Sequence, residues 1–100
     1  MLVRMFMSAV DPDDLPRIRE MFEEDIRPVL SRQPGCESVE LVVSTQRNAG
    51  GMVEGAAISR WRSVDDLEAA LSQHDVQDSI LRIRDLLRQE PVTKTYEVLG

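Results

Sequence analysis

An almost unbroken run of apolar residues opens the chain, from residue 2 to residue 10, with polar side chains only at Arg4 and Ser8. Its length, its β-branched and aromatic residues and the Asp-Pro segment that follows are typical of a strand. A strand that is apolar on both faces needs cover on both sides. One small domain cannot easily supply both covers, so we expect one face of the sheet to meet a partner.

Helical periodicity follows. The residues at three- and four-residue spacing are apolar and the positions between them are mostly charged, which predicts an amphipathic helix; the apolar set is Leu15, Ile18, Phe22, Ile26, Val29 and Leu30. The carboxylates of residues 11–14 can cap its start, and Pro34-Gly35 ends it. Pro28 lacks the amide hydrogen that the carbonyl of Glu24 would accept, so we expect a kink or a loosened last turn.

The middle of the chain predicts a hairpin. Val39, Leu41 and Val43 alternate with polar residues, and residues 47–51 supply turn residues before a third strand from about Met52 to Trp61. One face of that strand carries glycine, alanine and serine at positions 55, 57 and 59, beside the large indole of Trp61. Such a low stripe lets a helix approach closely, or it leaves room for a ligand.

The remaining elements have clear boundaries. Ser63 and Asp66 form a variant capping box that begins a helix. The apolar pattern breaks at residues 72–75 and resumes to about Gln89, which predicts a short helix, a break and a longer helix. Pro91 stops it, and residues 92–99 have the pattern of a closing strand. The order β-α-β-β-α-β predicts a single α+β domain over residues 1–100, with a four-stranded antiparallel sheet, central first and third strands, and helices on one face.

Net charge and residue composition limit the kinds of partner and compartment that suit this chain. A formal net charge of −6 argues against nucleic-acid binding, which needs a basic surface to displace phosphate counterions. The apolar N-terminal run is too short to cross a membrane. Cys36 is the only cysteine, which excludes an internal disulfide and fits a reducing compartment, so we expect a soluble, cytoplasmic protein. His74 is the only histidine, and no His/Cys metal spacing occurs, so no metal site is expected.

Few residues could carry chemistry. His74, followed by Asp75 at the helix break, could transfer a proton or could simply be a solvated side chain. Arg4 could pair with a carboxylate of a partner strand, or bind an anionic or phenolate ligand. Trp61 and Tyr96 could line a pocket for a flat aromatic ligand, or could only pack in the core and interface.

The pocket hypothesis also includes a residue of the predicted first helix. Phe22 is assigned with Trp61 and Tyr96 to the candidate ligand pocket. If Phe22 and Ile26 fill the space beside the indole, the site is only core.

Three segments carry a family resemblance: Pro34-Gly35, then Trp61-Arg62-Ser63 with Asp65-Asp66-Leu67, and finally Pro91 through Leu99. Together they resemble the antibiotic biosynthesis monooxygenase domain family over essentially the whole chain. The resemblance implies a ferredoxin-like protomer that assembles as a dimeric α/β barrel. It also implies one of several activities, because the family contains cofactor-independent oxygenases of quinols and polycyclic anthrones as well as haem-degrading enzymes.

The haem-degrading branch fits poorly. That resemblance would imply an asparagine in the first strand, a tryptophan in the second helix and a histidine as iron ligand. The first strand has no asparagine, the helix offers Ala69-Ala70-Leu71, and Ser79 lies near the ligand position. All three departures point away from haem cleavage. The oxygenase that we expect uses no metal, flavin or haem.

Two functions remain. The first is a cofactor-independent monooxygenase that acts on a small phenolic, quinol or polycyclic aromatic substrate. The alternative is a non-catalytic dimeric α/β-barrel protein that binds a small apolar ligand. In both cases we expect a homodimer formed through the uncovered sheet faces.

Overall fold

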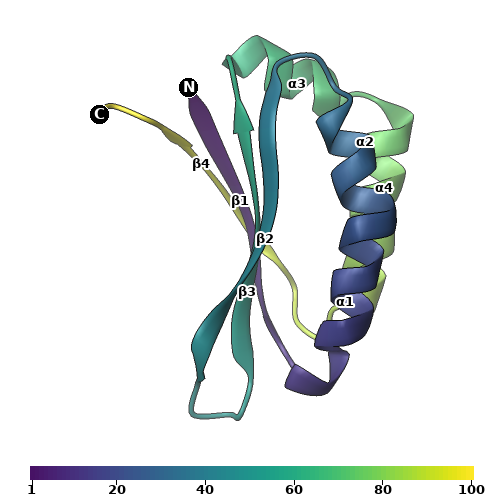
Figure 1. Ribbon diagram of the computed structural model, residues 1–100, viewed down its shortest axis with the longest axis vertical. Coiled ribbons are helices and arrows are strands. Elements are labelled where there is room, and N and C mark those ends of the chain that lie inside the picture. Colours follow the sequence, from purple (N-terminus) through teal and green to yellow (C-terminus); the bar gives the residue numbers. More distant parts are fainter.

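The computed structural model describes residues 1–100 as one sheet covered on one side by helices (Figure 1). The strands are β1 (Leu2–Val10), β2 (Cys36–Arg47), β3 (Val53–Trp61) and β4 (Val92–Glu97). They are antiparallel in the order β2-β3-β1-β4, so β1 and β3 are central, as the sequence predicts. The predicted α+β, ferredoxin-like fold is confirmed.

The helices are η1 (Pro12–Asp14), α1 (Leu15–Met21), η2 (Phe22–Ile26), α2 (Arg27–Ser31), α3 (Val64–Leu71) and α4 (His74–Leu86). The predicted break between α3 and α4 is confirmed, and Ser63 caps α3 by accepting a hydrogen bond from the Asp66 amide, at 3.2 Å. Two predicted ends were too long, because α4 stops at Leu86 rather than near Gln89 and β4 stops at Glu97 rather than Leu99. The hairpin strand β2 is longer than predicted and includes Arg47.

The register of the central strands decides which side chains meet the helices. Leu2 lies opposite Trp61 and Arg4 lies opposite Ser59. Because side chains alternate along a strand, the even-numbered residues of β1 and the odd-numbered residues of β3 face the helices. Leu2 and Trp61 are both buried in the main hydrophobic cluster on that side. The odd-numbered residues of β1 lie on the sheet face that no helix covers.

The distortion expected from Pro28 is present, one turn earlier than the proline itself. Residues Phe22–Ile26 form a single π-helical turn, and the Arg27 amide donates to the carbonyl of Phe22. Such turns add one residue to a helix and shift the side chains that follow. Phe22 and Ile26 are both buried, and between them Asp25 meets α4.

Asp25 joins the two helical segments. It accepts hydrogen bonds from the Ser79 hydroxyl at 2.7 Å and from Arg82 Nε at 2.6 Å. Ser79, the residue near the haem-ligand position, is only 1% exposed and is occupied by this contact. The hydrogen bond from Arg82 is the main reason that the pKa of Asp25 lies below its ordinary value. This carboxylate therefore stabilises the helix pair in its ionised form.

Two of the three sequence segments that carry the family resemblance meet at Gly35. Gly35 has φ +83°, and its carbonyl accepts a hydrogen bond from the Arg62 amide at 2.8 Å. A β-carbon at this position would overlap the Asp66 side chain at the start of α3. Both the backbone conformation and the close approach therefore require glycine.

We predict that Gly35→Ala lowers the melting temperature more than Gly51→Ala does. Both glycines have positive φ, which costs an alanine roughly 1–2 kcal/mol, but nothing lies within 4 Å of a β-carbon at Gly51. The difference between the two variants in thermal unfolding measures the contact with Asp66. Equal melting temperatures would contradict this account of the Pro-Gly motif.

We also predict that Asp25→Asn destabilises the protein at neutral pH and that its effect fades in acid. Because the folded pKa is lowered, the stabilisation is complete above the unfolded value of ~3.9 and is lost as pH falls through the folded pKa. Denaturant unfolding of both proteins at a series of pH values measures the gap between them. Glu23→Gln is the control, since its ion pair with Arg27 is exposed and should contribute at most ~0.5 kcal/mol. A gap for Asp25→Asn that does not change with pH would contradict the prediction.

Candidate functional site

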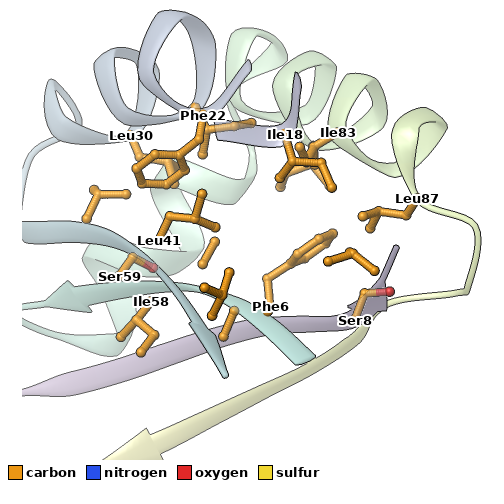
Figure 2. A pocket seen from close by; sticks show the side chains of 18 of the residues that line it. Phe6, Ser8, Ile18, Phe22, Leu30, Leu41, Ile58, Ser59, Ile83 and Leu87 are labelled. Atoms are coloured by element: carbon orange, nitrogen blue, oxygen red, sulfur yellow. The ribbon is translucent and has the colours of Figure 1, made fainter. Parts of the chain in front are cut away.

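A cavity lies between the helices and the sheet, along the middle of β1 and β3 (Figure 2). Its volume is about 60 Å³, several times the roughly 10–15 Å³ that one water molecule needs. Of the 20 residues that line it, 16 are hydrophobic, so its walls are almost entirely apolar. Ile18, Phe22 and Ile83 reach it from the helices and Phe6 reaches it from the sheet.

The small residues of β3 leave this space open. Gly55, Ala57 and Ser59 all line the cavity. A β-carbon at Gly55 would make only ordinary contacts at 3.7 Å and its φ is not positive, so neither crowding nor backbone strain requires glycine there. The stripe therefore allows the helices to approach without filling the gap completely.

The indole of Trp61 lies beside the cavity and does not line it. Trp61 is 1% exposed and belongs to the same hydrophobic cluster as Phe22 and Ile26, and both of those helix side chains also line the cavity. Its Nε1–H donates a 2.8 Å hydrogen bond to the hydroxyl oxygen of Ser59. Ser59 in turn lines the cavity, so the indole is linked to the cavity wall by this hydrogen bond.

Arg4 is the only charged residue among those that line the cavity. It is largely buried, and burial lowers the pKa of its guanidinium. None of the hydrogen bonds or ion pairs within the chain involves its side chain. A guanidinium in such a position is a donor without a partner.

His74 and Tyr96 lie elsewhere. His74 is exposed at the start of α4, and the neighbouring Asp75 is engaged by Arg32 at 2.8 Å, which lowers the pKa of that carboxyl. Tyr96 lies on β4 opposite Val3, with its side chain on the uncovered sheet face and 48% exposed. The structure thus brings Arg4 and Phe22 to the cavity and leaves His74, Tyr96 and the Trp61 ring outside its lining.

Sequence reasoning missed several lining residues. Phe6 and Ser8 share the strand parity of Arg4, which was the available signal, but the apolar run hid which face they occupy. Ile83 and Leu87 come from the far end of α4 and the residue after it, where only the three-dimensional packing places them.

Other chemical groups are spread over the molecule. No three His, Cys, Asp or Glu side chains come together as a potential metal-binding group. Cys36 is half-buried at the start of β2, and burial raises the pKa of its thiol, which fits a structural role. None of the helices has the length and apolar character needed to span a bilayer.

Solved structures with the same fold cover nearly the whole chain. A crystal structure named antibiotic biosynthesis monooxygenase aligns with a TM-score of 0.74 at 15% identity over 100% of both chains. A protein from Nitrosomonas europaea named for the same family aligns with a TM-score of 0.76 at 14% identity over 100% of both chains. Rv0793 from Mycobacterium tuberculosis aligns with a TM-score of 0.71 at 19% identity over 99% of this chain and 95% of its own. At these identities the likeness establishes the fold.

Sequence comparison provides the family. No curated protein matches the chain. The family model described as Antibiotic biosynthesis monooxygenase matches residues 1–82, from β1 into α4, so β4 lies outside the matched residues. A match over most of the chain, with the fold to accompany it, places this protein in the antibiotic biosynthesis monooxygenase family.

Proposed function

We propose that this protein is a cofactor-independent monooxygenase that acts on a small phenolic, quinol or polycyclic aromatic substrate held in the cavity between the helices and the sheet. The observation that carries the proposal is a single unpaired arginine in an otherwise apolar cavity. Apolar walls suit an aromatic ring, and the guanidinium suits the oxygen anion that such a ring forms on losing a proton. The cavity of about 60 Å³ is smaller than the ~150 Å³ that admits a benzene ring, so binding requires the lining side chains to move apart.

The chemistry asks little of the protein. A deprotonated quinol or anthrone is electron-rich enough to react with dioxygen directly. One oxygen atom enters the ring, and the other leaves as water with two hydrogens that the substrate supplies, so the substrate itself is the reductant. The Coulomb attraction between Arg4 and the anion is strengthened by the low dielectric of the apolar surroundings.

Proton removal has no protein base in the cavity. The lining includes no histidine and no carboxylate, and His74 is exposed at the start of α4. The substrate proton therefore leaves to water. The rate should rise with pH as the bound substrate ionises. The pH–rate profile should not fall again at higher pH, because no acid group of the protein takes part.

The alternative is a non-catalytic protein of the same fold that binds a small apolar molecule. The lack of a base among the lining residues favours it, because a protein that only binds its ligand has no proton to remove.

Oxygen uptake separates the two functions. We expect the protein to accelerate the oxidation of at least one compound in a panel of hydroquinones and anthrones, and Arg4→Met to reduce that acceleration about tenfold or more, since a hydrogen bond to a charged group contributes ~1.5–3 kcal/mol. The matched control is Arg19→Met, which removes an exposed arginine of α1. Binding of panel members without any acceleration over the spontaneous reaction would favour the binding protein.

We also propose that two copies of the chain associate through the uncovered sheet face. No helix covers that face of the sheet (Figure 1). Strand register and alternation put the apolar side chains of Val3, Met5, Met7 and Ile58 at its centre. Its edge strand β4 adds Val92 at 53% exposure and Tyr96 at 48%. A hollow of about 590 Å³ on this face is lined by both methionines and by Lys94. An apolar surface of this kind is typical of the interface of an obligate dimer.

Sedimentation at micromolar concentration tests the assembly. We expect a dimer for the wild type, and monomers or aggregates for Met5→Asp and Met7→Asp, because strand alternation puts both methionines on the uncovered face. Leu81→Asp is the control, since Leu81 is an exposed residue of α4 and should leave the dimer intact. A monomeric wild type would contradict the proposal.

A further inference from the structure

We propose that Ser59 and Arg4 together bind one anionic oxygen of the ligand, and that Trp61 positions the Ser59 hydroxyl for this contact. The inference deepens the proposed function and rests on it in one respect, namely that the cavity is the ligand site. Ser59 is then a specificity-determining residue, Trp61 is a positioning residue, and the ligand is an oxygen anion on an apolar body.

Ser59 has a hydrogen-bond donor that the protein does not use. The residue is 3% exposed, and its oxygen accepts the hydrogen bond from Trp61 Nε1. An indole N–H can only donate, so the hydroxyl proton of Ser59 must point to another acceptor. No protein atom accepts it, and the surrounding cavity walls are apolar.

Ser8 provides the contrast. It is the only other serine that lines the cavity, and it occupies the same face of the sheet. Its hydroxyl reaches the backbone carbonyl of Gln89 at 3.2 Å. Its donor is therefore satisfied within the chain, whereas the donor of Ser59 is free for a ligand.

Arg4 lies directly across the strand pair from Ser59. Residues in such opposing positions have β-carbons about 4.5–5.5 Å apart and point to the same side of the sheet. One oxygen atom above this pair can accept from the serine hydroxyl and from the guanidinium at once. No aspartate or glutamate lines the cavity to take that place.

The pair selects the charge of the ligand. Both groups donate in this arrangement, and one carries a fixed positive charge, so the favoured group is a phenolate, an enolate or a carboxylate. If the oxygen of a neutral phenol accepts from both Ser59 and Arg4, its own proton has no acceptor among the apolar walls. The indole holds the serine oxygen from the opposite side and so keeps its proton directed away from Trp61.

A coloured phenol tests this directly. We would titrate 4-nitrophenol with pH by absorbance, free and bound to the full-length protein. Bound to the wild type, its pKa should fall by about one unit or more, which corresponds to tenfold tighter binding of the anion than of the neutral phenol. Ser59→Ala and Arg4→Met should each lose most of that shift, and Arg4→Lys should keep part of it. Arg19→Met, which removes an exposed arginine of α1, is the control and should keep all of it.

Trp61→Phe tests the positioning role. It keeps an aromatic ring in the core but removes the N–H, so it should reduce the pKa shift of bound nitrophenol while the protein still unfolds cooperatively in a thermal melt. A merely structural tryptophan would lower the melting temperature and leave the shift unchanged.

The outcomes separate this inference from the proposed oxygenase. A wild type that binds nitrophenol without a pKa shift, does not bind it at all, or keeps its full shift in Ser59→Ala overturns the anion site. Oxygen uptake that is unaffected by Ser59→Ala would overturn the anion site and keep the oxygenase. A Ser59-dependent shift with no oxygen uptake on any quinol would keep the anion site and overturn the oxygenase.

Discussion

The pairing of β1 with β3 is the interaction on which the rest of the structure depends. Its register puts Leu2 against Trp61 at one end, where the main hydrophobic cluster forms, and Arg4 against Ser59 two pairs further in. A shift of one residue would turn every side chain of β1 to the opposite face. Arg4 would then leave the cavity, and Met5 and Met7 would turn from the uncovered face toward the helices.

The helix layer is fixed to the sheet at two points. At one end, the Pro-Gly turn lets the start of β2 approach the cap of α3 so closely that only glycine fits. Along the helices, the π turn at Phe22–Ile26 presents two apolar side chains to the sheet and one carboxylate to α4. Between these points, the small residues of β3 keep the helices from sealing the gap. The cavity is thus a consequence of the side-chain sizes on one strand.

The order of elements was predictable from the sequence because each element has local signals, such as the Ser63 cap, the Pro28 distortion and the break before His74. The candidate site was predictable only in part. Arg4 and Phe22 were found because a charge in an apolar strand and an aromatic residue on a helix stripe are visible locally. Tyr96 and Trp61 could not be separated by sequence, because their placement depends on the registers of two different strand pairs. The uncommitted donor of Ser59 depends on a hydrogen bond that no local pattern reveals.

The central claim is that ligands bind between the helices and the sheet, and nuclear magnetic resonance tests it most directly. Trp61 is the only tryptophan, so its indole N–H gives one signal that reports the hydrogen bond to Ser59. On addition of a phenolate, we expect that signal and the methyl signals of Ile18 and Ile83 to shift together, while those of the exposed Leu81 and Val92 stay in place. Shifts confined to Leu81, Val92 or other surface residues, with the indole signal unchanged, would contradict the account.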